Sequence, residues 1–205
     1  MIDIEIYKKI KTYQGVKELV VKDKIPQGSV TKVYGPSGAG KTTFLRMIAG
    51  LVSPERGRIK AGDQLWFDAA VKLNLSPQER RAGFVFQDYA LFPNMTAMEH
   101  LRYATADQPL IERLLQIGKM EAFAGHKPQQ LSGGQQQRLA ILRALALRPK
   151  LLLMDEAFSA LDDELREELI TDLKVILKEF EASTIIVSHH AQETLGFADR
   201  SLKIE

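Results

Sequence analysis

Short segments rich in apolar and β-branched residues alternate along the chain with segments of helical periodicity. The sequence predicts strands at 29–34 (SVTKVY), 82–87 (AGFVFQ), 151–156 (LLLMDE) and 183–189 (STIIVSH). Two of these segments are nearly continuous in apolar residues, which is typical of strands buried on both faces of a parallel sheet. The first thirteen residues, MIDIEIYKKIKTY, alternate apolar and polar positions and are also predicted as a strand.

Helical patterns separate the predicted strands. One predicted helix covers 42–51 (TTFLRMIAGL), after a glycine-rich stretch, and another covers 163–180 (DELREELITDLKVILKEF). The second helix places apolar side chains three and four residues apart, as amphipathic helices do, at Leu165, Leu169, Leu173, Ile176 and Phe180. Strands that alternate with helices favour an α/β fold with a parallel-rich sheet.

The segment 94–147 has a different pattern from the rest of the chain. It carries helical periodicities and no convincing strand. We therefore expect a helical insertion at 94–147 in the α/β core, and one domain over residues 1–205.

Composition and charge exclude several classes of protein. Hydrophobic residues make up 45% and charged residues 26% of the chain, as in ordinary globular proteins. The formal net charge of +2 does not indicate a general polyanion binder, and the lack of cysteine excludes disulfides, zinc-thiolate sites and thiol catalysis. No apolar run has the length of a bilayer span, and the first residues lack the apolar block of a secretion signal. We expect a soluble, cytoplasmic chain that reaches a membrane only through a partner.

A phosphate-binding pattern lies between a predicted strand and a predicted helix. The stretch 35–43 (GPSGAGKTT) fits G-x-x-x-x-G-K-[ST]. Glycines allow a tight turn that brings backbone N–H groups close to phosphate oxygens, and the following helix presents its positive end to the same anion. Lys41 can reach the terminal phosphates, and the Thr42 hydroxyl can ligate Mg²⁺. A plain glycine turn is disfavoured, because the motif requires a strand before it and a helix after it, and both are predicted.

Two carboxylates follow a second apolar run, at 151–158 (LLLMDEAF). The run predicts a buried strand, and Asp155 and Glu156 stand at its carboxyl end, where ligands bind in open α/β sheets. Asp155 would hold Mg²⁺, directly or through water, and Glu156 would accept a proton from an attacking water. An acidic pair at a strand end is often only solvated, but its combination with a phosphate-binding loop favours the catalytic interpretation.

A third motif, 131–140 (LSGGQQQRLA), places a serine and two glycines before a predicted helix. Ser132 is a good helix cap by residue type. With Gly133 and Gly134 it would offer a hydroxyl and bare amides at a positive helix end, which is a second site suited to an anion. The chain therefore carries two predicted phosphate-binding surfaces that are distant in sequence.

These motifs together resemble the ATP-binding-cassette (ABC) family. GPSGAGKT, LSGGQ and LLLMDE are similar to its Walker A, signature and Walker B motifs, in the family's order. Gln87 in FVFQD resembles the Q-loop glutamine, SALD at 159–162 resembles the D-loop, and His189 resembles the switch histidine. The chain departs from the family at Ala157, where proline is common, and at His190, where an acidic residue is common. Neither position has a catalytic role, and the resemblance covers nearly the whole chain.

The resemblance implies a P-loop NTPase core with an N-terminal antiparallel β region and an inserted α-helical subdomain. It also implies ATP and Mg²⁺ as cofactors. The residues implied in nucleotide binding are Tyr13, Gly35, Pro36, Ser37, Gly38, Ala39, Gly40, Lys41, Thr42, Thr43, Ser132, Gly133, Gly134, Gln135 and Asp162. Those implied in metal binding are Thr42, Gln87 and Asp155, and those implied in catalysis are Glu156, His189, Gln87 and Lys41.

Family members pair head to tail, so that ATP lies between the Walker A motif of one subunit and the signature of the other. This pairing would explain why one chain carries two phosphate-binding surfaces. In it His189 would hold the γ-phosphate, Gln87 would link the site to the helical insertion, and Asp162 would couple the two sites. The aromatic residue that stacks on adenine would be Tyr13 or its rival Tyr7, and a half-buried strand tyrosine is an equally good interpretation.

The stretch 80–103 (RRAGFVFQDYALFPNMTAMEHLRY) resembles the Q-loop region of oxyanion and metal importers, most closely molybdate-type cassettes. The resemblance implies an ATPase at the cytoplasmic face of the membrane, with a second copy of itself, permease subunits and an extracytoplasmic solute-binding protein as partners. Importers of this group often continue into a β-rich regulatory domain, and because the chain stops at ADRSLKIE we expect none.

Other uses of ATP remain as alternatives. The chain could serve another ABC complex, such as an exporter or a membrane-remodelling assembly. A soluble mechanical ABC ATPase acting on DNA or ribosomes is disfavoured by the short gap between P-loop and signature, the single cassette and the near-neutral charge. We therefore expect no nucleic-acid partner. A small-molecule kinase or GTPase is disfavoured because the guanine-reading motif Asn-Lys-x-Asp is absent and LSGGQ has no use there.

Overall fold

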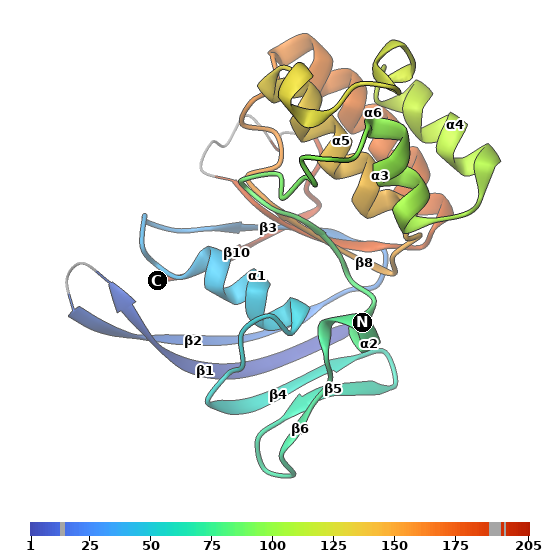
Figure 1. Cartoon of the computed structure of the whole chain (residues 1–205). Helices are drawn as coiled ribbons and strands as arrows, with labels where there is room; N and C mark the ends of the chain where they lie inside the picture. Colours follow the sequence, from blue (N-terminus) through green and yellow to red (C-terminus); the bar gives the residue numbers. More distant parts are fainter. Residues whose placement is uncertain (13–14, 189–193, 195) are drawn as a thin grey trace.

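The computed structural model describes residues 1–12, 15–188, 194 and 196–205. Two five-stranded sheets form layers on either side of helix α1 (Lys41–Ala49), and the other long helices cover the far face of the second sheet (Figure 1). The order of layers is therefore antiparallel sheet, α1, parallel sheet and helices. This arrangement confirms the predicted α/β class with a parallel-rich sheet.

The first sheet is antiparallel, with the strand order β2-β1-β4-β5-β6. Its strands are β1 (Ile2–Thr12), β2 (Gly15–Ile25), β4 (Arg56–Ala61), β5 (Gln64–Asp68) and β6 (Leu73–Asn74). The alternation in β1 buries Ile2, Ile4, Ile6 and Ile10 on one face, where they pack in the same core cluster as the apolar residues of α1. The N-terminal alternation thus correctly predicted a strand with one buried face.

The second sheet is parallel, with the strand order β10-β3-β9-β8-β7. Its strands are β3 (Val30–Tyr34), β7 (Gly83–Val85), β8 (Leu151–Asp155), β9 (Ser183–Val187) and β10 (Arg200–Lys203). Successive residues of β8 face opposite layers: Leu151 and Leu153 belong to the core around α1, while Leu152 and Met154 belong to the core under the helices. This two-sided burial explains why the strand is continuously apolar.

The segment 94–147 is helical, and all of its residues are described. It contains α3 (Ala97–Ala104), α4 (Gln108–Ile117) and α5 (Gly133–Ala146), with short 3₁₀ turns at Glu121–Phe123 and Pro128–Gln130. Helix α6 (Asp163–Glu179) packs beside them and buries Leu169, Leu173 and Ile176, as its spacing predicts. Among the described residues, no helix is both long and apolar enough to cross a membrane.

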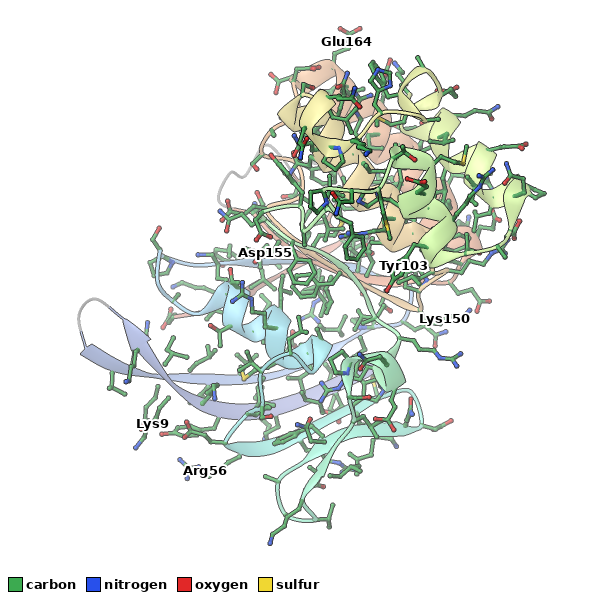
Figure 2. The ribbon with its side chains drawn as sticks, viewed as in Figure 1. Lys9, Arg56, Tyr103, Lys150, Asp155 and Glu164 are labelled. Atoms are coloured by element: carbon green, nitrogen blue, oxygen red, sulfur yellow. The ribbon has the colours of Figure 1, made fainter. Side chains whose placement is uncertain are left out.

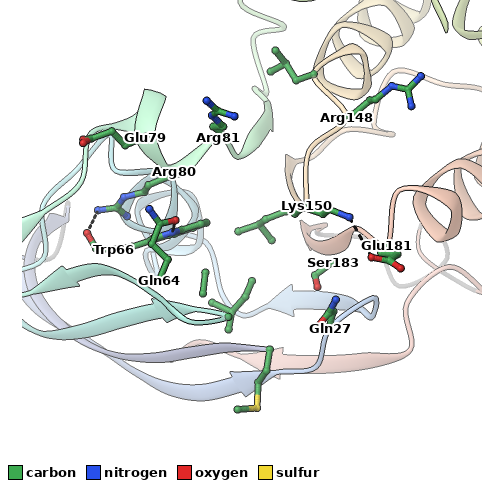
Figure 3. Close-up of a pocket in the computed structure, with 16 residues that line it drawn as sticks. Gln27, Gln64, Trp66, Glu79, Arg80, Arg81, Arg148, Lys150, Glu181 and Ser183 are labelled. Carbon is green, nitrogen blue, oxygen red and sulfur yellow. Dashed lines mark hydrogen bonds and ion pairs between the residues drawn. The ribbon is translucent and has the colours of Figure 1, made fainter.

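A buried arginine joins the antiparallel sheet to the end of α1. Arg80 ends the short helix α2 (Pro77–Arg80), and its side chain is 4% exposed. The guanidinium donates to the Met47 and Ile48 carbonyls at the end of α1, both at 2.8 Å, and to the Trp66 carbonyl of β5 (Figure 3). Burial lowers the pKa of Arg80 to about 10. The arginine supplies the carbonyl groups at this helix end with the donors that water supplies at exposed ends.

Replacing Arg80 by methionine should destabilise the fold. The variant removes the arginine donor from the buried Ile48 carbonyl and leaves the Met47 carbonyl with the Gly50 N–H alone. We therefore expect the free energy of unfolding in urea to fall by roughly 3 kcal/mol. The neighbouring exposed Arg81 is the matched control, and Arg81→Met should change the free energy of unfolding by less than about 0.5 kcal/mol. Equal stabilities of the two variants would contradict the assigned role.

A buried histidine fixes the start of the helical segment. His100 of α3 is fully buried, its Nδ1 lies 2.7 Å from the Thr96 carbonyl, and its Nε2 accepts the N–H of Phe92 at 2.8 Å. These partners require the neutral ring with the proton on Nδ1. Burial, the largest cause, lowers the pKa of His100 below its ordinary value.

This histidine should make stability depend on pH. Because the folded state resists protonation, stability from His100 is complete above the unfolded pKa of about 6.5 and falls as pH drops below it. The expected slope is at most about 1.4 kcal/mol per pH unit for one proton. Urea unfolding between pH 5 and 8 should show this slope in the wild type and lose it in His100→Gln. An unchanged slope in the variant would assign the pH dependence to other groups.

Candidate functional site

The phosphate-binding motif forms the turn between β3 and α1. Gly35 has φ 154°, and a Cβ at this position would lie 2.0 Å from the carbonyl oxygen of Ile204, so only glycine fits. Gly40 is the N-cap of α1 and offers no side-chain hydrogen bond to the helix. The first N–H groups of α1 are therefore not capped by a side chain, at the end where the helix dipole favours an anion.

Lys41 lies over this turn. Its side chain is buried, and Nζ donates to the carbonyl oxygens of Gly35 at 3.0 Å and Pro36 at 2.9 Å. Burial is the largest influence and lowers the pKa of Lys41, while the nearby carboxylates of Glu156 and Asp155 act in the opposite direction. The loop thus holds one cation beside its bare amides, an arrangement suited to phosphate oxygens.

A hydroxyl and a carboxylate meet where α1 faces the end of β8. The Thr42 hydroxyl donates to Oδ1 of Asp155 at 3.2 Å, and Asp155 is 2% exposed. Asp155 is the last residue of β8, at the carboxyl end of a strand in the parallel sheet (Figure 2). Oxygen ligands of these two kinds are the ones that Mg²⁺ uses beside nucleotide phosphates. The donor set therefore fits the implied metal.

Glu156 follows β8 in an unusual backbone conformation. Its φ is 52°, in the left-handed region that few residues other than glycine adopt, and its N–H donates to the Val187 carbonyl of β9 at 3.0 Å. Nε2 of Gln87 lies 3.4 Å from Oε2 of Glu156. Gln87 and Glu156 share a cavity of about 410 Å³ with Lys41 and Thr42. The cavity thus brings these residues together from three distant segments.

The signature segment lies apart from this cavity. Ser132 caps α5: its hydroxyl accepts the N–H of Gln135 at 3.3 Å, and the Gln135 side chain accepts the N–H of Ser132 at 2.8 Å. Ser132 and Gly133 are exposed. None of the residues found to line the cavity around Lys41 belongs to 132–135. Within one chain, the two predicted phosphate-binding surfaces do not meet.

Asp162 caps α6, and its carboxylate accepts the N–H of Leu165 at 2.9 Å. Tyr7, the rival for adenine stacking, does not line the cavity; its hydroxyl donates to Glu18, and the Arg56 guanidinium lies 3.9 Å from the centre of its ring. Ile10 and Lys11 of β1 reach the cavity instead. Tyr13 and His189 lie outside the described residues, so the structure does not place these two predicted site residues.

One residue at this site was not identified from the sequence. Gln137, inside α5, is 1% exposed, and its side chain donates to the Glu156 carbonyl at 2.9 Å and accepts the N–H of Ala160 at 2.8 Å. Glutamine in a helix usually faces solvent, so its residue type alone did not mark it. A polar run of QQQ entering a buried apolar helix was the one available hint.

Comparisons with known proteins agree with this geometry. The ABC transporter family model matches residues 20–159. The chain is 39% identical to the sulfate/thiosulfate import ATP-binding protein of Bacillus cereus (95% of this chain, 56% of that protein) and 41% identical to the spermidine/putrescine import ATP-binding protein of Fusobacterium nucleatum (97% and 54%). It is 36% identical to the molybdenum import ATP-binding protein of Haemophilus ducreyi (100% and 58%). The chain spans little more than half the length of these curated relatives.

Solved structures show the same fold. A dimeric post-hydrolysis structure of the ATP-binding cassette MJ0796, bound to ADP and Pi, superposes with a TM-score of 0.85 at 31% identity. The superposition covers 100% of this chain and 94% of that one. With the family model, the curated relatives and this superposition in agreement, the chain belongs to the ABC transporter family.

Proposed function

We propose that this chain is the ATP-binding and ATP-hydrolysing subunit of an ABC importer. The observation that carries the proposal is the shared cavity in which Lys41, Thr42, Gln87 and Glu156 meet, with Asp155 hydrogen-bonded to Thr42. A cation, bare amides, a hydroxyl and two carboxylates are the groups that a phosphoryl-transfer site needs, because such sites act by positioning and by charge stabilisation.

The turn 35–43 and the start of α1 would bind the phosphates of ATP. Lys41, already held against the loop, would turn its ammonium toward the terminal phosphates, and Thr42, Asp155 and Gln87 would hold Mg²⁺. The metal would supply charge stabilisation of the phosphate oxygens. The buried setting of Lys41 supports this role, since an ion pair formed away from water is stronger than one formed in it.

Glu156 would act as the general base. Its position just after β8, with Gln87 in hydrogen-bonding reach, suits a carboxylate that orients a water and accepts its proton. His189 would hold the γ-phosphate and orient that water. That role stays a prediction from the motif.

A second copy of the chain would complete each site. Ser132, Gly133, Gly134 and Gln135 would contact the partner's ATP, and Asp162 would lie at the interface between the two sites. Two observations support this pairing: the capped start of α5 is exposed and remote from its own chain's cavity, and the neighbouring MJ0796 structures are dimeric. An arrangement in which each copy serves the other has two-fold symmetry.

The membrane partner would be a permease, served by an extracytoplasmic solute-binding protein, with this chain at the cytoplasmic face. The segment 80–103 contributes Phe84, Phe86, Phe92 and Tyr103 to a mostly apolar cavity of about 380 Å³, and the Tyr103 side chain is 68% exposed. Such a hollow suits a short helix of a permease. Molybdate or a similar oxyanion is the substrate class we propose; relatives that import sulfate/thiosulfate and molybdenum support it, and a polyamine relative is the competing case.

Removing the Lys41 charge should weaken nucleotide binding. Lys41→Ala loses charge-assisted hydrogen bonds to phosphate, so we expect the Kd for ATP–Mg to rise roughly 10- to 100-fold in calorimetric titration. Lys174→Ala, an exposed lysine on α6, is the control and should bind as the wild type does. Unchanged ATP affinity and unchanged hydrolysis in Lys41→Ala would contradict the assignment of the turn 35–43 as the phosphate-binding loop.

Glu156→Gln should separate binding from chemistry. The variant keeps the side-chain shape but loses the base, so ATP hydrolysis should fall by about 10²–10⁴ while ATP still binds. Because ATP that is not hydrolysed would stay bound to the paired state, it should convert the variant to a dimer, which light scattering would detect.

Adding Ser132→Arg to that variant should abolish the ATP-dependent dimer, since the arginine blocks the surface that receives the partner's nucleotide. Wild-type turnover in Glu156→Gln would mean that another group is the base. Slow turnover without a dimer at any concentration, either alone or with the permease, would refute the head-to-tail arrangement.

A further inference from the structure

The signature helix and the catalytic glutamate are joined inside one chain by a single side chain. Gln137 stands five residues after Ser132 on α5, and its amide bridges two backbone positions in the segment after β8. Nε2 donates to the carbonyl oxygen of Glu156, and Oε1 accepts the N–H of Ala160. Both donor–acceptor distances, 2.9 and 2.8 Å, are those of good hydrogen bonds.

The Glu156 backbone needs this support. A non-glycine residue at φ 52° is strained and persists only when its surroundings hold it. The N–H of Glu156 is held by Val187, and its carbonyl is held by Gln137 and by the Ser159 hydroxyl at 3.0 Å. Since the peptide groups before and after Glu156 are both fixed, the direction in which its carboxylate leaves the backbone is fixed as well.

Burial makes the amide bridge specific. Gln137 is 1% exposed, so neither amide atom can exchange its partner for bulk water, and losing one bond would leave a buried polar atom unpaired. Helix α5 also lies close to the same loop at its first turn, where a Cβ on Gly134 would come within 3.1 Å of the Ala160 carbonyl oxygen. A movement of the start of α5 must therefore be accommodated by the loop that follows Glu156.

We infer that Gln137 is a positioning residue for ATP hydrolysis: it ties the signature helix to the backbone of Glu156, so that the partner's nucleotide on Ser132–Gln135 and the base of the same chain move as one unit. The inference rests on the proposed function. The proposed function has a contact between subunits, and the inference adds a connection within each subunit. That connection is made by Gln137, which touches neither ATP nor metal in the proposed arrangement. Glutamine is suited to the role because its amide donates through Nε2 and accepts through Oε1 across one fixed width.

Two substitutions test the bridge. Gln137→Met fills similar space without hydrogen bonds, and Gln137→Glu keeps an acceptor for Ala160 but loses the donor to the Glu156 carbonyl. Because small displacements of a catalytic group cost large factors in rate, we expect kcat to fall at least about tenfold in both variants, with KM for ATP within about twofold of the wild-type value.

The neighbouring Gln136 provides a matched control. Its amide also bonds carbonyl groups, of Pro128 and Leu131, but it does not reach the loop after β8. Gln136→Met should lower the unfolding free energy about as much as Gln137→Met does and should leave kcat within about threefold of the wild-type value. A structural role alone would lower kcat equally in the two variants.

The double variant Gln137→Met/Glu156→Gln separates positioning of the base from damage to the signature surface. It should still form the ATP-dependent dimer, because Ser132–Gln135 are intact. Wild-type kcat in Gln137→Met, loss of the dimer in the double variant, or equal losses of kcat at Gln136 and Gln137 would each overturn the inference. A wild-type chain that neither binds nor hydrolyses ATP would instead overturn the proposed function.

Discussion

The burial of α1 between two sheets is the constraint on which the rest of the structure depends. Phe44, Leu45, Met47 and Ile48 are fully buried, because one side of the helix packs on the antiparallel sheet and the other on the parallel sheet. The backbone polar groups of a helix enclosed in this way can meet partners outside the helix only at its ends. Arg80 satisfies its carboxyl end, and its amino end remains for an anion.

The same layering places the chemistry at one edge of the parallel sheet. Because β3, β8 and β9 run in parallel, their carboxyl ends lie together, and the turn 35–43, Asp155 and the Val187 carbonyl that holds Glu156 all follow from that register. The helical segment contributes at the same edge through Gln137. The candidate site is thus formed by the carboxyl ends of parallel strands, the amino end of α1 and the buried amide of Gln137.

Sequence patterns predicted the strands and helices where burial is periodic or continuous, as in β1, β8 and α6. The local motif around Lys41 and the pair Asp155–Glu156 were identified because their residue types and spacing carry the chemistry themselves. Arg80 and Gln137 were missed because each acts through contacts distant in sequence: an Arg-Arg pair and a Gln-rich helix both suggest exposed surface. No local sequence pattern marks the left-handed backbone of Glu156. None marks the separation between the LSGGQ segment and the cavity around Lys41 in the same chain.

The enclosure of α1 also determines where an observer could attach a probe. Among the nine residues of α1, all of them described, Arg46 is the exposed one, and the chain contains no cysteine. A single thiol introduced at that position would therefore carry a fluorophore or spin label on the helix that follows the phosphate-binding turn. The Arg46 backbone carbonyl, which accepts the N–H groups of Leu51 and Val52 at the helix end, is unaffected by a change of side chain. Because α1 is enclosed, position 46 is the one exposed site on this helix for a spectroscopic label.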